Sequence, residues 1–262
     1  MRMDYHLHSA FSGDGRSAIG QICRSALEKG LTHIAITDHH DIGNKPFELK
    51  GFDSYLQDLA QARADYPALD LAFGLEMDYR PETWQQMKTI PAQLSMDFAL
   101  LSLHFIDGVD PYLPEYFEHR TQREGYCLYL NRLAEMIDAT EGPWVLAHIT
   151  YVAKFARFPD PALRYGDYAD ALDAVLKRVV QKGYGLEVNA SGIKNGAGLL
   201  PGADVLRRYR ELGGEIVATG SDAHAAEDVG RWITEASDAV RAAGFRYLAA
   251  YRQLKPEFIK ID

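Results

Sequence analysis

The stretch His33-Ile34-Ala35-Ile36-Thr37, followed directly by Asp38-His39, decides the fold class. Its length and its apolar, β-branched residues are typical of a buried strand. The segment before it spaces five apolar residues as one helical face and then reaches Gly30, a common helix stop: Ile19, Ile22, Cys23, Ala26 and Leu27. A buried strand next to an amphipathic helix indicates a β/α unit.

The same alternation recurs along the chain. Further strands are expected in residues 2–8, 71–76, 98–104, 144–148, 184–189 and 215–220, and further helices around residues 52–59, 172–180 and 205–212. Alternating strands and helices form a parallel sheet that either closes as a barrel or is doubly wound. Because no glycine-rich phosphate loop follows a strand, we favour the barrel. Residues 105–126, rich in proline and aromatics, are expected to form a long loop over one end.

Composition restricts the class of protein. With 262 residues, 47% hydrophobic and 25% charged, the chain can bury a large core as one domain, residues 1–262, without disulfides. Its 28 Lys plus Arg against 37 Asp plus Glu give a net charge of −9, which argues against a long nucleic acid as partner but not against a small anion.

Composition also suggests the cellular compartment of the protein. Two cysteines, Cys23 and Cys127, cannot form a disulfide framework, and this favours a reducing compartment. No apolar run approaches the ~18–20 residues of a membrane span, and residues 1–4 lack the pattern of a signal peptide. We therefore expect a soluble, cytoplasmic protein with no membrane partner, while its oligomeric state stays open.

Histidine and carboxylate residues gather where the expected strands end. His6 and His8 share one face of the first strand, and further members follow later strands: His39, Glu76, His104, His148, Asp222 and His224. Because the carboxyl ends of barrel strands meet at one rim, these side chains should converge. One His-x-His pair alone is often a polar stripe, but six agreeing strand ends favour a metal site. Imidazole and carboxylate ligands suit zinc, iron or manganese.

This pattern resembles the polymerase-and-histidinol-phosphatase (PHP) superfamily. The matching motifs run in the family's order: His6-Leu7-His8-Ser9, Asp14, Thr37-Asp38-His39, Glu76, His104, His148 and Ser221-Asp222-Ala223-His224. The resemblance implies a distorted (β/α)7, TIM-like barrel holding two or three divalent ions (Zn, Fe or Mn). It implies a first ion on His6, His8, Glu76 and Asp222, a second on Glu76, His104 and His148, and a third on Asp14, His39 and His224. Many relatives have histidine where this chain has Asp14.

Three stretches resemble the histidinol-phosphate phosphatase branch: residues 102–108, 187–194 and 254–256. This implies hydrolysis of the small phosphomonoester L-histidinol phosphate to L-histidinol and phosphate, in histidine biosynthesis. Glu76 and Asp222 would then serve catalysis by holding two metals that are bridged by a hydroxide nucleophile. Two alternatives are a phosphoesterase for nucleotides or short oligonucleotides and a non-catalytic, metal-stabilised accessory domain. The acidic balance does not count against mononucleotides, whereas the complete ligand set argues against the accessory domain.

Contacts to the substrate are predicted from position. Arg157 and Lys194 follow strand ends and are expected to bind phosphate, the alternative being solvated loop charges. For Arg157→Ala we expect a loss of roughly 2–4 kcal/mol in transition-state binding. His40 either protonates the leaving group or faces outward. Three loop residues could face the amine and imidazole of the substrate: Asp78, Asp107 and Tyr112.

Overall fold

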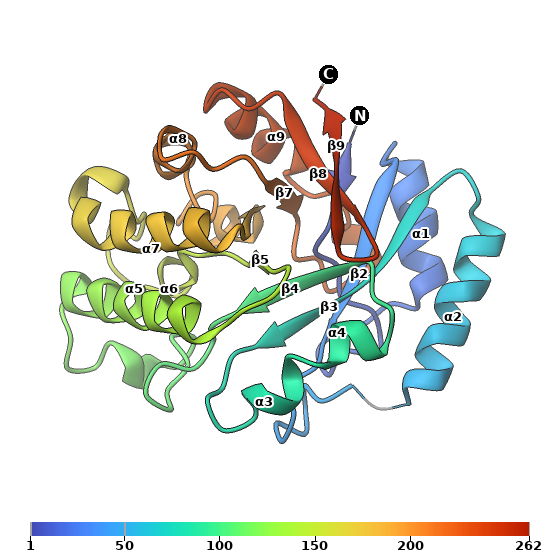
Figure 1. Ribbon diagram of the computed structural model, residues 1–262, viewed down its shortest axis with the longest axis horizontal. Coiled ribbons are helices and arrows are strands. Elements are labelled where there is room, and N and C mark those ends of the chain that lie inside the picture. The colour runs from blue at the N-terminus through green and yellow to red at the C-terminus, as the bar shows by residue number, and fades with distance from the viewer. Residues whose placement is uncertain (1, 50, 262) are drawn as a thin grey trace.

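Seven parallel strands in sequential order make up the main sheet of the computed structural model, which describes residues 2–49 and 51–261 (Figure 1). Every neighbouring pair is parallel. The strands are β1 (Met3–Asp4), β2 (His33–His39), β3 (Asp70–Asp78), β4 (Phe98–Ser102), β5 (Val145–Leu146), β6 (Gly185–Asn189) and β7 (Val217–Gly220). All seven overlap the segments predicted from the sequence, and β2 and β3 extend beyond theirs.

The sheet closes between its first and last strands. Beyond β1 the backbone N–H of Tyr5 donates to Thr219 O (2.8 Å), and that of His8 donates to Ala223 O (2.9 Å). In return, the N–H of Asp222 donates to His6 O (2.9 Å). Because closure runs through residues outside the regular strands, the barrel is distorted, and the predicted (β/α)7 architecture is confirmed.

Helices surround the sheet (Figure 1). They are α1 (Ile19–Glu28), α2 (Phe52–Asp65), α3 (Trp84–Met87), α4 (Ile90–Gln93), α5 (Gln122–Ala139), α6 (Tyr151–Lys154), α7 (Ala169–Lys182), α8 (Ala203–Glu211) and α9 (Ile233–Ala242). The predicted apolar face of α1 is buried, and α7 ends at Gly183, whose φ of 68° is the left-handed conformation that terminates helices. Short 3₁₀ turns occupy Pro114–Tyr116, Tyr165–Asp167, Ser191–Asn195 and Ala226–Asp228.

The predicted loop over residues 105–126 is too long at its carboxyl end, because α5 begins at Gln122. The N–H of Glu124 donates to Thr121 Oγ1, and Glu124 Oε2 accepts the Thr121 N–H (2.8 Å). This reciprocal pair is a capping box, for which Thr-x-x-Glu is the sequence signal. The loop itself therefore ends at Thr121.

A carboxyl-terminal hairpin, not predicted from the sequence, lies at the amino ends of the barrel strands. It pairs β8 (Tyr247–Arg252) with β9 (Lys255–Lys260). The ring of Tyr251 packs 5.0 Å from that of Phe98, and the N–H of Leu254 donates to Asp97 O (2.8 Å). The hairpin therefore covers the end of the barrel opposite the predicted site.

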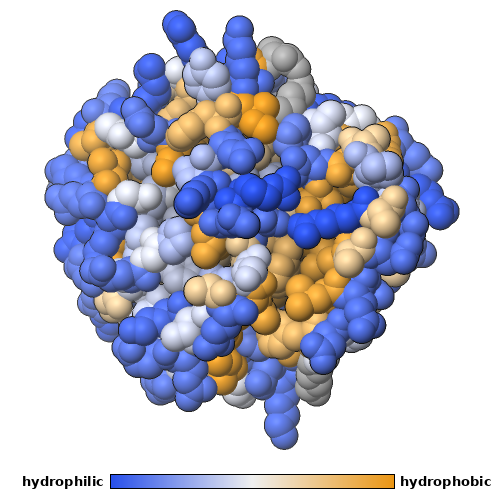
Figure 2. All heavy atoms as spheres, turned by 45° about the vertical axis from the view of Figure 1, so that its right-hand side comes forward, coloured by the Kyte–Doolittle hydropathy of each residue, from blue (hydrophilic) through white to orange (hydrophobic). Residues whose placement is uncertain are grey.

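Polar and apolar side chains are mixed on the surface. On the face shown in Figure 2, hydrophilic side chains surround and cross a patch of hydrophobic ones. Large hydrophobic side chains that are exposed include Tyr112, Leu113, Tyr247 and Phe258. Within residues 2–49 and 51–261, no helix combines the length and hydropathy needed to cross a bilayer.

Candidate metal centre

A cleft of about 700 Å³ opens at the carboxyl ends of the barrel strands. Seven of the nine predicted metal-binding residues line it: Asp14, His39, Glu76, His104, His148, Asp222 and His224. The other two, His6 and His8, are fully buried beneath the cleft, and both lie close to Glu76. The structure thus brings together side chains that lie up to 218 positions apart between His6 and His224.

Glu76, in β3, is the hub of the cluster. Its Oε1 lies 2.9 Å from His148 Nε2 and 3.4 Å from His104 Nε2. Its Oε2 lies 3.1 Å from His6 Nε2, 3.2 Å from His39 Nδ1 and 3.5 Å from His8 Nε2. Burial alone would raise the pKa of Glu76, but the surrounding imidazoles hold it well below its usual range. One charged carboxylate therefore sits among five imidazoles.

Asp222 supplies a second carboxylate from the end of β7. Its Oδ1 lies 3.5 Å from His8 Nε2 and 3.7 Å from His6 Nε2. Its Oδ2 accepts hydrogen bonds from Lys154 Nζ (2.7 Å) and Ser191 Oγ (3.1 Å). Burial raises its pKa, yet Lys154 and the imidazoles hold the pKa well below its usual range. The side chain therefore has one oxygen for the imidazoles and one for the cation of Lys154.

Two of these residues adopt a left-handed backbone that non-glycine residues rarely take. His148 has a φ of 29° and Asp222 a φ of 58°. Such conformations cost about 1–3 kcal/mol each and persist where neighbouring structure imposes them, often at functional sites. Here the backbone turns each side chain from a strand end toward the cluster.

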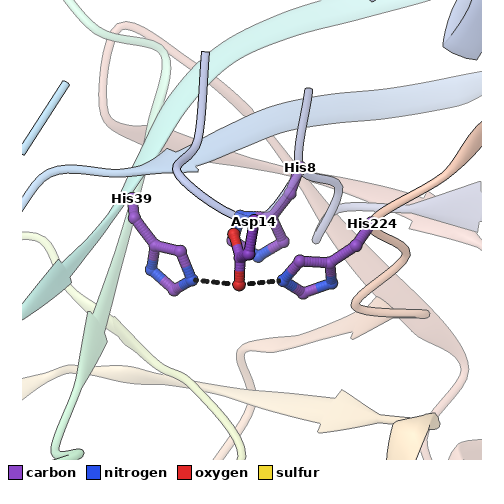
Figure 3. Close-up of side chains that lie close together, drawn as sticks. All are labelled: His8, Asp14, His39 and His224. Atoms are coloured by element: carbon purple, nitrogen blue, oxygen red, sulfur yellow. Dashed lines mark ion pairs between the residues drawn. The ribbon is translucent and has the colours of Figure 1, made fainter. Parts of the chain in front are cut away.

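Another group of side chains that could hold a metal consists of His8, Asp14, His39 and His224. Figure 3 shows Asp14 between the imidazoles of His39 and His224. Asp14 Oδ2 lies 3.0 Å from His224 Nε2 and 3.8 Å from His39 Nε2. Burial and the facing His224 lower the pKa of His8 to about 4, and burial with His8 lowers that of His39 to about 3. Neutral imidazoles are the form that binds metals.

The donor set fits divalent cations. Nitrogen or oxygen donors lie within 4.8 Å of one another in four groups: His8, Asp14, His39 and His224; His6, His148 and Asp222; His6, His8 and Glu76; and Glu76, His104 and His148. His6 Nδ1 faces a carboxylate oxygen of Glu187 (2.7 Å), and with its proton on Nδ1 the imidazole would present Nε2 to a metal. His6 Nε2 lies 3.1 Å from Glu76 Oε2, and a cation between these two atoms would take both as ligands.

A layer of buried carboxylates supports the cluster, and sequence reasoning assigned no role to most of it. Asp38 accepts the N–H and hydroxyl of Ser9, and Asp4 does the same for Ser221. Asp78, predicted as a substrate contact, is buried and accepts the backbone N–H of His104 (2.7 Å). These carboxylates fix the segments that carry the imidazoles.

The structure does not support two predicted roles, that of His40 as a proton donor and that of Arg157 as a phosphate contact. The ring of His40 packs 5.0 Å from Phe52, and His40 is absent from the described residues that line the cleft. Because side chains alternate along a strand, the residue after cleft-facing His39 points away, so His40 is not placed to protonate a leaving group. Arg157 is exposed and lines a smaller neighbouring pocket instead of the cleft.

Of the other predicted substrate contacts, some line the cleft and one does not. Lys194 and Tyr112 line the cleft, whereas Asp107 is exposed and pairs with Arg132 (2.8 Å). Three cations that the sequence reasoning missed also line the cleft: Arg16, Lys154 and Arg231. Lys154 occupies the last position of α6, six residues after His148, and the helical turn there directs it toward Asp222.

Comparisons with known proteins agree with this geometry. A family model described as "PHP domain" matches residues 4–191. A protein of Clostridium acetobutylicum named "probable histidinol-phosphatase" is 29% identical over 238 residues, covering 88% of this chain and 89% of the relative. The histidinol-phosphatase of Lactococcus lactis is 24% identical over 266 residues, covering 97% and 96%.

Solved structures show the same fold. A crystal structure of histidinol phosphate phosphatase from Lactococcus lactis, in complex with zinc, L-histidinol and phosphate, matches with a TM-score of 0.88 and 24% identity. The match covers 98% of each chain. The fold of this chain is therefore that of the matched structure.

Proposed function

The chain belongs to the PHP domain family, and on this premise we propose that residues 1–262 form one metal-dependent phosphomonoesterase domain that hydrolyses L-histidinol phosphate to L-histidinol and phosphate. The observation that carries the proposal is the convergence of seven imidazole-bearing or carboxylate residues on Glu76 and Asp222 in one cleft lined by cations. The relatives of similar length, named as histidinol-phosphatases, support the choice of substrate.

The cluster would hold two or three divalent ions, of zinc, iron or manganese. We assign His6, His8, Glu76 and Asp222 to one ion, Glu76, His104 and His148 to a second, and Asp14, His39 and His224 to a third. The distances support these groups, although His8 is also near the third group and His148 near Asp222. When bound, such ions supply an activated water and neutralise phosphate charge.

Cationic side chains of the chain itself would bind the phosphate oxygens. Lys154, Lys194, Arg16 and Arg231 all line the cleft. Lys154 stands out because its Nζ is 2.7 Å from Asp222 Oδ2, so a phosphate beside Asp222 is within its reach. Phosphoryl transfer depends chiefly on positioning and charge neutralisation, which these residues would provide.

The leaving alcohol, L-histidinol, carries an amine and an imidazole. Asp110, at the cleft, offers a carboxylate partner for these cationic groups, and Tyr112 and Tyr151 offer aromatic faces. The hydroxyl of Tyr151 donates to Asp110 Oδ1 (3.1 Å), which fixes the carboxylate at the wall of the cleft. The cleft thus has a carboxylate for the alcohol and cationic groups for the phosphate.

Phosphate release from three substrates tests the proposal: L-histidinol phosphate, a mononucleotide and an aryl phosphate, each with protein loaded with Zn²⁺ or Mn²⁺. We expect kcat/KM to favour L-histidinol phosphate by several orders of magnitude. Comparable, slow release from all three would overturn the substrate and favour a phosphoesterase of broad specificity. No release from fully metal-loaded protein would overturn the enzymatic function.

A further inference from the structure

Glu187, in the middle of β6, is a fully buried carboxylate that the proposed chemistry does not use. Its Oε1 lies 2.7 Å from His6 Nδ1, and its Oε2 accepts the backbone N–H of His148 (2.8 Å). The two residues it contacts reach the cluster from opposite sides, one beyond β1 and the other beyond β5. One side chain therefore holds two members of the cluster at once.

The backbone N–H of His148 and the amide of Asn189 donate to Glu187, and His6 Nδ1 can donate when it carries a proton. Asn189 Nδ2 lies 3.2 Å from Oε1 and 3.3 Å from Oε2. Asn189 cannot turn its amide around, because its Oδ1 accepts the N–H and the hydroxyl of Ser191 (2.9 and 2.6 Å). Only a group with two acceptor oxygens satisfies this set of donors, and a carboxylate is such a group.

The fold reserves space for this carboxylate. At Gly220, in the adjacent strand β7, a Cβ atom would lie 2.2 Å from Glu187 Oε1 and 2.4 Å from His6 Cβ. Both distances are far below van der Waals contact, so no other residue fits there without moving Glu187 or His6. The glycine is thus explained by the contact between these two side chains.

We propose that Glu187 is the positioning residue of the metal centre, setting His6 with its Nε2 lone pair toward Glu76 and holding the His148 backbone so that its Nε2 reaches the same carboxylate. The inference rests on the proposed function, since it assumes that these nitrogens bind metal. A hydrogen bond from Nδ1 to a carboxylate fixes the orientation of a ligand imidazole and increases its basicity. Glu187 would act so on His6, and through the backbone on His148.

The substitution Glu187→Gln tests this with little change in volume. An amide has a single acceptor oxygen, so its NH₂ must face either His6 Nδ1 or the N–H of His148. In the first case the amide favours a His6 tautomer with the proton on Nε2, which blocks metal binding. In the second, two donors meet, and the His148 backbone loses its acceptor. Either result weakens the ions assigned to His6 and His148, but not the one held by Asp14, His39 and His224.

Asp97→Asn is the control for general stability; Asp97, unlike Glu187, also pairs with Arg63 (2.7 Å). Asp97 is also a buried carboxylate that accepts backbone N–H groups, from Phe73 and Gln253 (both 3.1 Å), but it lies at the opposite end of the barrel. A general loss of stability should affect both variants, whereas a loss of metal affinity should be confined to Glu187→Gln.

The experiment strips purified full-length protein with a chelator and titrates Co²⁺ against a chromophoric competitor, following the visible absorption of bound cobalt. For Glu187→Gln we expect affinity lower by about 10- to 100-fold at all but one of the sites, with an altered cobalt spectrum. Asp97→Asn should match the wild type in both.

Each contrary outcome has a distinct meaning. Wild-type affinity and spectrum in Glu187→Gln would overturn the positioning role while leaving the proposed function intact. An equal loss of affinity in Asp97→Asn would also overturn it, because the effect would then be one of general stability. A wild-type protein that binds no cobalt would overturn the metal centre and the proposed function together.

Discussion

Replacing Lys154 with methionine removes the cation nearest to the carboxylates of the cleft while keeping much of the side-chain volume. Lys154 Nζ lies 2.7 Å from Asp222 Oδ2, and the side chain is 16% exposed. A hydrogen bond to a charged group in such a shielded position contributes about 1.5–3 kcal/mol. Since 1.36 kcal/mol corresponds to a factor of ten in rate, kcat/KM for L-histidinol phosphate should fall roughly 10- to 150-fold.

Arg157→Ala is the comparison for this variant, because it removes a cation three residues further along the same segment. Arg157 lines the neighbouring pocket with Phe158 and Pro114, so we now expect kcat/KM to change by less than about threefold. This replaces the larger loss expected from the sequence. Metal content of both variants is measured alongside, because Lys154 also hydrogen-bonds Asp222.

The assay is steady-state phosphate release at neutral pH with metal-loaded protein. The reasoning is refuted if Lys154→Met retains kcat/KM within threefold of the wild type. It is refuted equally if Arg157→Ala loses as much as Lys154→Met, because the cleft would then not be the binding site of the phosphate. Lower metal content in Lys154→Met alone would assign its effect to Asp222 instead of the phosphate.

Three further predictions concern the metals and the barrel. Removal of metals by a chelator should abolish phosphate release, and Zn²⁺ or Mn²⁺ should restore it; activity that persists after metal analysis reads zero would contradict the centre. Glu76→Gln, which removes the charge among five imidazoles, should lower kcat at least 100-fold and reduce bound metal, and unchanged metal content would exclude Glu76 as a ligand. Asp173 accepts Arg208 Nε and Nη2 (2.8 and 2.7 Å), joining α7 to α8, so Asp173→Asn should lower Tm by about 2–4 °C without changing kcat/KM. Because Arg208 holds the pKa of Asp173 well below the ordinary ~3.9, this stabilisation is complete above that pH and is lost as pH falls through the lowered pKa. The difference in Tm should thus be equal at pH 5 and pH 8; a difference that vanishes at pH 5 would contradict the ion pair.

The strands and the main cluster could be predicted because their signals are local. A buried strand is a short apolar run, and a barrel places whatever follows each run at one rim. The side chains of His39, Glu76 and His148 therefore converge as the sequence analysis expected. The same rule of alternation could have placed His40 outside the cleft, since it follows His39 directly.

The direction in which side chains point from irregular segments could not be predicted. Arg157 and Lys154 both follow β5, and only the turn of α6 decides that Lys154 faces Asp222. The role of Glu187 was also hidden, because its partners, His6 and His148, are 181 and 39 positions away. One local signal was overlooked: Thr121-x-x-Glu124 marks the start of α5.

Anomalous diffraction from crystals of the zinc-loaded protein tests the central claim most directly. The account predicts two or three strong peaks in the cleft, one of them within about 2.0–2.2 Å of both His6 Nε2 and a carboxylate oxygen of Glu76. A map without peaks between these residues, or with zinc bound only at surface positions elsewhere, would contradict it.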